Sequence, residues 1–201
     1  MNGEKFRNTF ISIKGILGLI EAKDIAIPEI QRPFVWKNSQ VRDLIDSLYK
    51  GYPTGYIILW KNPNVKLKDG TISSGKKLII AGQQRITALM TAVAAQKDIT
   101  NEIKECRVKI AFNPFAALDY ANGNSEAEIF AVQTPAHLKS KYWIPDISEI
   151  FSTSFSSWTF IPKYIEPKSK MRADDLQGGL NTLKGIEAIQ LGVIELSENL
   201  D

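Results

Sequence analysis

The sequence is organised around Lys77-Leu78-Ile79-Ile80-Ala81-Gly82-Gln83-Gln84-Arg85-Ile86-Thr87-Ala88-Leu89-Met90. Its first part, Leu78 to Ala81, is an unbroken apolar run and predicts a short strand that is buried on both faces. Apolar residues then recur at positions 86, 89, 90 and 93, which is the spacing of a helix with one buried stripe. The chain therefore changes from strand to helix at Gly82-Gln83-Gln84.

This turn has the features of an anion-binding site. Gly82 permits backbone angles that are closed to other residues and lets a ligand approach the main chain. A helix start points its free N–H groups outward, and Gln83, Gln84 and Arg85 add amide and guanidinium donors. Phosphate is the simplest ligand for such a pocket. The alternative is an ordinary strand-to-helix junction in which Arg85 pairs with a structural carboxylate.

A second informative segment comes earlier, at Glu29-Ile30-Gln31-Arg32-Pro33-Phe34-Val35-Trp36. An amide, a guanidinium and two aromatic rings between prolines suit a binding edge better than a core strand. Aromatic faces stack on bases, and arginine forks onto phosphate or onto a base edge. We therefore expect Gln31 and Arg32 to serve binding. For Phe34 and Trp36 the simpler interpretation is packing beneath the next helix.

The rest of the pattern predicts both helices and strands. Helical spacing predicts helices over residues 11–22, from a cap at Asn38 or Ser39 to Gly51, from the central turn to about residue 95, and over 176–189. Strands are predicted at 25–28, 56–60, 78–81, 106–112, 126–132 and 192–196. Asn113-Pro114 is interpreted as the end of the strand 106–112, and residues 122–124 as the turn into the next strand. Residues 152–170 allow no assignment.

Composition limits the class of protein. With 201 residues, 44% of them hydrophobic, the chain can bury a core as one large domain or two small ones. The net charge of +3 neither requires nor excludes nucleic acid, because phosphate contact depends on where charges cluster. One cysteine, Cys106, and one histidine, His137, cannot alone form a disulfide or a zinc site, and we predict no metal ligands. Without a signal peptide or a membrane-spanning stretch, we expect a soluble, cytoplasmic protein with no membrane contact.

Two motifs together resemble a known family. Ile27-Pro28-Glu29-Ile30-Gln31-Arg32-Pro33-Phe34-Val35-Trp36 and Ile79-Ile80-Ala81-Gly82-Gln83-Gln84-Arg85-Ile86-Thr87-Ala88-Leu89 are similar to the N-terminal domain of GmrSD-type, modification-dependent restriction endonucleases. That family also includes the SspE anti-phage proteins. Its signatures are proline followed by Gln-Arg-x-aromatic-x-Trp, and Asp-Gly-Gln-Gln-Arg-hydrophobic-Thr. Weaker similarity continues through residues 110–114, 143–144 and 189–196, and so spans most of the chain.

The resemblance implies an α+β fold. Its core is ParB/sulfiredoxin-like, a small mixed sheet with flanking helices, and a C-terminal α/β extension follows. We assign the core to residues 1–115 and the extension to residues 116–201. Because the last strand lies so close to Asp201, we expect the extension to be truncated. In the family, the Gly-x-x-Arg turn at the helix start holds nucleotide phosphates, which is the pocket that the residues themselves suggest.

The resemblance also implies roles for individual residues. The implied nucleotide-binding turn consists of Gly82, Gln83, Gln84, Arg85 and Thr87, with Gln84, Arg85 and position 81 as catalytic positions. The implied cleft for nucleotide or modified DNA is lined by Gln31 and Arg32 and walled by Phe34 and Trp36. The implied ligand is a nucleoside triphosphate, with Mg²⁺ as a candidate ion.

Two departures from the family pattern bear on catalysis. The aspartate that precedes the glycine in the family is Ala81 here. A methyl group cannot hold a magnesium water, orient an attacking water or anchor Arg85. Backbone donors remain, so we expect nucleotide binding to survive better than hydrolysis. Whether the chain is an enzyme stays open. Whether Ala81 is natural or engineered also stays open. The later aromatic-x-Arg-x-Asn segment of the family and any nuclease domain are absent from these residues.

The sequence thus predicts an NTPase-type, nucleotide-binding and modified-DNA-sensing module of a type IV-like restriction or anti-phage defence protein. It would regulate an HNH-type nuclease domain outside this chain and act on phage or foreign DNA that carries glucosylated cytosine or phosphorothioate linkages. The nucleotide, the modification and homo-oligomerisation stay open. The alternatives are a ParB-like domain with its own nuclease activity, for which no acidic cluster is evident, and a degenerate protein-interaction module without catalysis.

Overall fold

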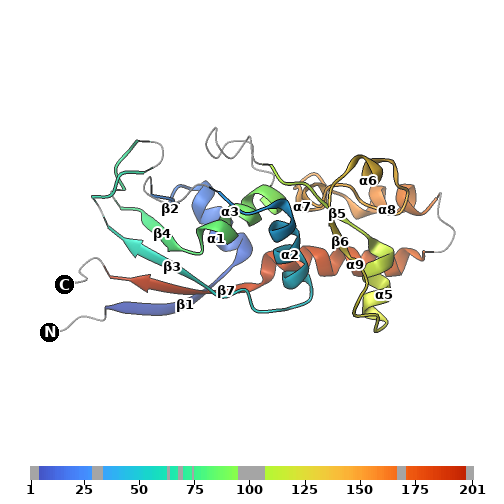
Figure 1. The fold of residues 1–201 in the computed structure, drawn as a ribbon, viewed down its shortest axis with the longest axis horizontal. Coiled ribbons are helices and arrows are strands. Elements are labelled where there is room, and N and C mark those ends of the chain that lie inside the picture. Colours follow the sequence, from blue (N-terminus) through green and yellow to red (C-terminus); the bar gives the residue numbers. More distant parts are fainter. Residues whose placement is uncertain are drawn as a thin grey trace.

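A computed structural model describes residues 5–28, 34–62, 64–67, 70–73, 75–94, 107–166 and 171–197. The molecule is elongated, with a five-stranded sheet at one end and a mainly helical part at the other (Figure 1). The predicted α+β class, with a mixed sheet and flanking helices, is confirmed. Across the described ranges, none of the helices combines the length and the apolar character that crossing a membrane needs.

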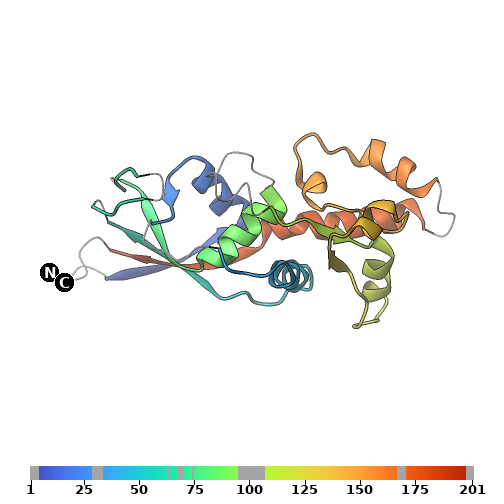
Figure 2. The ribbon, with the colours of Figure 1, turned by 45° about the horizontal axis from the view of Figure 1, so that its top comes forward.

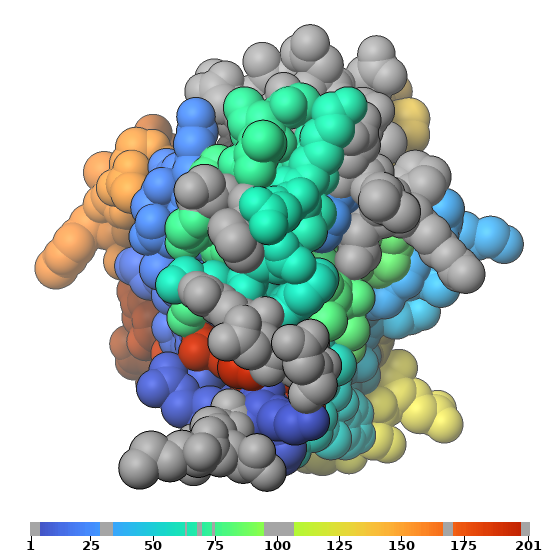
Figure 3. Space-filling view, turned by 90° about the vertical axis from the view of Figure 1, so that its left-hand side faces the viewer, coloured from blue at the N-terminus to red at the C-terminus, as the bar shows by residue number. Residues whose placement is uncertain are grey.

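The main sheet draws its strands from both ends of the chain. Its order is β1 (Phe6–Ser12), β7 (Gln190–Leu196), β3 (Tyr56–Lys61), β4 (Lys77–Ala81) and β2 (Ile25–Ala26). The β1–β7 and β3–β4 pairs are antiparallel, whereas β7–β3 and β4–β2 are parallel. Seen from its end, blue β1, red β7, and the teal and green strands β3 and β4 follow one another across the surface (Figure 3). Strand β7 comes from the predicted extension, so the predicted core and extension share one sheet.

Helices cover the apolar face of this sheet. Helix α1 (Ile13–Glu21) begins where the side chain of Ser12 accepts a hydrogen bond from the Gly15 N–H, and it buries its apolar stripe in the core. Helix α3 (Gln83–Leu89) continues into a π-helical turn, η1 (Met90–Ala94). Figure 2 shows α1 and α3 on the same side of the sheet. The helix predicted over residues 11–22 is confirmed in its central part, but its start is wrong because residues 11 and 12 belong to β1. The helix predicted from the central turn to about residue 95 is confirmed as far as Ala94, with a π-helical turn at its end.

Helix α2 (Asn38–Tyr49) begins earlier than predicted. The predicted cap at Asn38 or Ser39 is wrong, because both residues lie inside the helix. The cap is Lys37, whose N–H donates to Oε1 of Gln40 at 2.8 Å. A side chain three residues along thus satisfies the helix start, as in a capping box.

The second part of the chain contains short elements. These are β5 (Ile110–Phe112), α5 (Pro114–Ala121), β6 (Phe130–Val132), α6 (Pro135–Lys139), α7 (Ser148–Phe151), α8 (Ser157–Ile165), α9 (Ala173–Gly185) and the 3₁₀ turn η2 (Ile186–Ala188). Strand β5 is shorter than predicted and is buried throughout, not half-exposed. Helix α5 was not predicted: Oδ1 of Asn113 accepts from the N–H groups of Phe115 and Ala116, and Pro114 occupies the first turn. Asparagine followed by proline here starts a helix as well as ending a strand.

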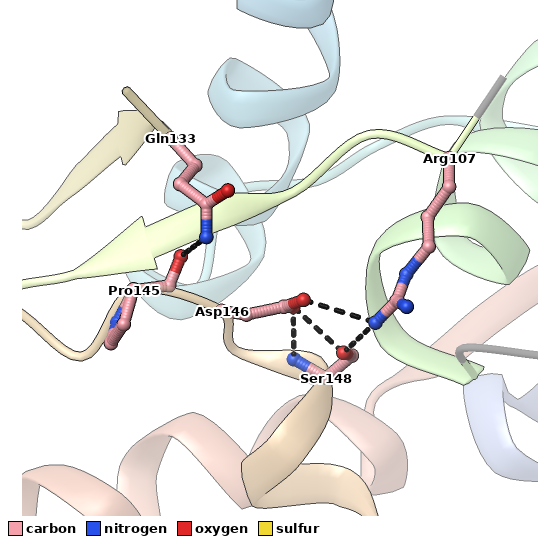
Figure 4. A network of polar contacts seen from close by, with 5 residues as sticks. All are labelled: Arg107, Gln133, Pro145, Asp146 and Ser148. Carbon is pink, nitrogen blue, oxygen red and sulfur yellow. Dashed lines mark hydrogen bonds and ion pairs between the residues drawn. The ribbon is translucent and has the colours of Figure 1, made fainter. Parts of the chain in front are cut away.

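A buried polar network fixes the start of α7 (Figure 4). Nη2 of Arg107 donates to Oδ2 of Asp146 at 3.0 Å and to Oγ of Ser148 at 2.8 Å. The other carboxylate oxygen of Asp146 accepts from the N–H and the hydroxyl of Ser148. Nearby, the amide of Gln133 donates to the carbonyl of Pro145 at 2.8 Å. The side chain of Asp146 is only 6% exposed, and these bonds compensate its burial.

Aromatic packing joins the two parts. The ring of Tyr49, on α2, lies 5.9 Å from the ring of Phe112 and 5.4 Å from the ring of Phe130. Burial raises the pKa of Tyr49 to about 12, partly offset by a hydrogen bond with Thr182. The buried apolar side chains form one cluster that includes both parts. The sheet that carries the central turn is therefore packed against a continuous core.

Candidate functional site

The site is built on the junction between β4 and α3. Gly82 has φ +88°, in the left-handed region, and separates Ala81 from the first helical residue. A Cβ atom here would collide with Cδ1 of Ile57 and lie 3.4 Å from the Ile57 Cα. Only glycine therefore lets the turn pass so close to β3. The first helical bond runs from the Ile86 N–H to the Gly82 carbonyl at 3.1 Å, so the N–H groups of residues 83–85 lie ahead of the helical ladder.

Arg85 lies at this junction and binds the loop that leads into β3. Its Nη1 donates to the carbonyl of Thr54, and its Nη2 donates to the carbonyl of Tyr56 at 2.9 Å. The partners are thus main-chain carbonyls and not the carboxylate that the alternative interpretation expected. Burial lowers the pKa of Arg85 from its ordinary value. The two bonds occupy two of the five guanidinium N–H groups, which leaves donors for a ligand.

Gln84 connects the junction to the second sequence motif. Its Oε1 accepts a hydrogen bond from the Val35 N–H at 3.0 Å. Val35 lies next to Trp36, and Trp36 lines the same cavity as Gln84. A side chain of the helix start therefore holds the main chain of the segment 34–36.

The side chain of Gln83 is buried beside the helix start. It is 7% exposed, and the part of the chain that the structure describes offers its carboxamide no hydrogen-bond partner. Burying an unpaired polar group costs about 1–3 kcal/mol. Such a group calls for an explanation, and a bound ligand or water supplies one.

These residues line a cavity of about 710 Å³. Small-molecule sites commonly measure about 300–1,000 Å³. The described residues that line it are Pro28, Trp36, Trp60, Val65, Leu78, Ile80, Ala81, Gly82, Gln83, Gln84 and Arg85. Most are apolar, and their polar members all belong to the helix start. The site is therefore suited to a ligand with one polar or anionic end and one apolar end.

The structure brings together some of the predicted site residues. Ala81 and residues 82–85 line the cavity, and Trp36 both lines it and packs against the core. Phe34 packs against the core, as the simpler interpretation expected. Thr87 is 4% exposed within α3 and is not among the described residues that line the cavity. Gln31 and Arg32 lie outside the described residues.

The sequence reasoning missed the apolar wall, notably Trp60 and Val65. Trp60 is paired with Leu78 across the β3–β4 ladder, and Leu78 lines the same cavity. The only local signal was a tryptophan at the end of a predicted strand. Its partner strand, and hence its place at the cavity, depends on the sheet register.

The described residues do not form a protein-ligated metal site. Among them, no three histidine, cysteine, aspartate or glutamate side chains are grouped to hold a metal ion. The described cavity lining also contains no carboxylate. Since Mg²⁺ prefers carboxylate and phosphate oxygens, these residues do not fit a Mg²⁺ ion held by the protein itself.

Comparison with known proteins places the chain in a family. The model of the family described as GmrSD restriction endonuclease, N-terminal domain, matches residues 13–196. This range contains both sequence motifs, the β4–α3 junction and the central strand β7. A search of the curated proteins finds no match. Because the family match covers most of the 201 residues, the chain belongs to the family of GmrSD restriction endonuclease N-terminal domains.

Proposed function

We propose that this chain is a nucleotide-binding module that senses modified DNA and regulates a restriction nuclease. Family membership makes it a restriction-endonuclease-associated module. The cavity at the β4–α3 junction carries the nucleotide part of the proposal. It joins a helix start, two carboxamides and a guanidinium in one space of a suitable size.

The phosphates would bind at residues 82–85. The N–H groups ahead of the helical ladder favour negative charge, and the helical stretch continues from Gln83 to Ala94 through η1. Arg85 keeps N–H donors beyond those used by the two carbonyls. The buried amide of Gln83 gains a partner when an anion fills the cavity. A bound phosphate would thus accept hydrogen bonds from the main-chain N–H groups, from Arg85 and from Gln83.

The Gln84 side chain gives a route from nucleotide to DNA recognition. Oε1 of Gln84 holds the Val35 N–H, so a ligand that moves Gln84 changes the support of the segment 34–36. This segment ends the family-like motif that begins at residue 27, for which the resemblance implies contact with the nucleotide or with modified DNA. Nucleotide occupancy would then bias the position of that motif, which couples nucleotide state to DNA engagement.

We expect this chain to bind nucleoside triphosphate without hydrolysing it efficiently. Ala81 lines the cavity where the family pattern has an aspartate, and a methyl group neither orients water nor accepts its proton. The described lining contributes no other carboxylate or imidazole that could replace it. The module would therefore respond to the presence of nucleotide, and cutting would belong to a nuclease domain outside this chain.

The substitution Gln83→Leu tests the nucleotide proposal. It removes a buried amide that has no hydrogen-bond partner among the described residues, so the free energy of unfolding should stay unchanged or rise by about 1 kcal/mol. Calorimetric titration with nucleoside triphosphate should nevertheless show about tenfold weaker binding, the loss of roughly one hydrogen bond to a charged group. Gln177→Leu is the matched control, since Gln177 bonds Asn181 on α9 and lies away from the cavity.

Two results would contradict the proposal: no nucleotide binding by the unaltered chain, or equal affinity after Gln83→Leu. The DNA part is tested separately. Binding of modified and unmodified duplexes is compared with and without nucleotide, and the preference for modified DNA should depend on nucleotide. An equal preference for modified DNA with and without nucleotide would contradict the proposed coupling through Gln84.

A further inference from the structure

The cavity follows the direction of β4. Leu78 and Ile80, two residues apart on the same face of the strand, both line it, and Gly82 lies at the end where the helix starts. At about 3.3 Å per residue, the distance from Leu78 to Gly82 is roughly 13 Å. Trp60 is paired with Leu78 in the ladder and so lies at the end far from the helix. The cavity is therefore long as well as large.

Its two ends differ in chemistry. Within the described lining, the polar side chains are those of Gln83, Gln84 and Arg85, all at the helix start. The far end is walled by Trp60, Val65 and Leu78. The Trp60 ring is held in place, because its Nε1 donates to the carbonyl of Ser197 at 3.2 Å. Trp60 thus lines the apolar end of the cavity, roughly 13 Å along β4 from the proposed phosphate position.

We propose that this far end, walled by Trp60, Val65 and Leu78, holds the base of the nucleotide. The inference rests on the proposed function, since it orients the same ligand along β4 with its phosphates at residues 82–85. Bases stack on aromatic side chains whatever their hydrogen-bonding edge, because every base has a π-face. The preferred ligand is therefore a nucleoside triphosphate with its base, and not an inorganic polyphosphate chain.

Titration with two probes separates the base from the phosphates. The unaltered chain should bind ATP roughly 10- to 100-fold more tightly than inorganic tripolyphosphate, which is the usual effect of one stacked base. Trp60→Ala should reduce ATP affinity to that of tripolyphosphate and leave tripolyphosphate affinity unchanged. Trp60→Phe loses the bond to Ser197 but keeps an aromatic face, so it should retain most of the ATP preference.

Two further variants guard against misfolding and nonspecific effects. Val65→Phe fills the apolar end without touching the Trp60 hydrogen bond, and it should also abolish the ATP preference. Trp158→Ala is the matched control, because Trp158 is 89% exposed on α8 and does not line the cavity. It should bind both probes as the unaltered chain does. Circular dichroism and thermal unfolding verify that each variant is folded.

The outcomes distinguish this inference from the proposed function. Equal affinity of the unaltered chain for ATP and tripolyphosphate, with no effect of Trp60→Ala or Val65→Phe, overturns the base position and leaves the phosphate position intact. Binding of neither probe overturns the proposed function and the base position with it. Loss of ATP preference in both variants, with tripolyphosphate binding retained, supports the inference.

Discussion

The substitution Gly82→Ala tests the geometry on which the site depends. Gly82 has φ +88°, and its Cα faces the side chain of Ile57, which is 1% exposed on β3. An added methyl group meets two obstacles. The left-handed conformation costs a non-glycine residue about 1–2 kcal/mol. The buried Ile57 side chain must also leave its preferred rotamer, at about 0.5–1.5 kcal/mol.

The expected loss is therefore about 2–3 kcal/mol in the free energy of unfolding, from the sum of these two effects. For a chain of this size, that corresponds to a fall in Tm of about 5–10 °C. Urea unfolding followed by circular dichroism gives the free energy, and calorimetry gives Tm. Nucleotide affinity, measured on the folded variant, should fall as well because the turn must move away from β3.

Gly51→Ala is the control for the backbone effect. Gly51 has φ +76°, but a Cβ there would meet nothing within 4 Å. It should lose only the conformational part, about 1–2 kcal/mol. In the background of Gly82→Ala, the change Ile57→Val deletes the colliding Cδ1 atom and should recover part of the loss in a double-mutant cycle. Equal losses for the two glycines, together with no coupling to Ile57, would refute the close approach of the turn to β3.

Three further predictions concern charge. Burial alone would raise the pKa of Glu195, but its pairing with Lys77 at 2.6 Å and with Arg7 at 3.1 Å outweighs burial and keeps that pKa below its ordinary value. The stability that Glu195 adds relative to Glu195→Gln should therefore be complete at neutral pH and disappear as pH falls through the lowered pKa, as measured by urea unfolding across a pH series. Arg107→Ala should cost about 2–3 kcal/mol by leaving the buried Asp146 carboxylate unpaired, and the double variant with Asp146→Asn should cost less because it removes that charge. Ala81→Asp should raise the rate of nucleoside triphosphate hydrolysis in a phosphate-release assay, and an unchanged rate would show that more than this carboxylate is missing.

The local patterns predicted the centre of the fold well. The change from strand to helix at Gly82 was visible because an apolar run and a helical stripe adjoin there. The prediction at Asn113-Pro114 was incomplete, because this pair ends a strand but also caps and begins α5. Both uses depend on the same chemistry, an asparagine acceptor and a proline without an N–H, so sequence alone could not separate them.

Other features depend on contacts between distant segments. Arg85 donates to the carbonyl groups of Thr54 and Tyr56. Every residue has a carbonyl group, so the sequence does not indicate which loop provides these acceptors. The role of Gln84 in holding Val35 was equally invisible, because the two residues are far apart in the chain. Periodicity indicates which side chains are buried, whereas the register of a sheet decides which neighbours they meet.

The position of β7 has a consequence for how the protein is made. Strand β1 pairs only with β7 among the described strands, and one edge of β3 is completed only by β7. A ribosome releases β7 last of these strands, so the nascent chain carries β1 without a neighbour and β3 with a bare edge until residues 190–196 emerge. Pairings this distant form slowly and leave edges open to association with other chains. Expression at low temperature or with chaperones should therefore improve the soluble yield more for this chain than for a protein whose sheet closes from neighbouring hairpins.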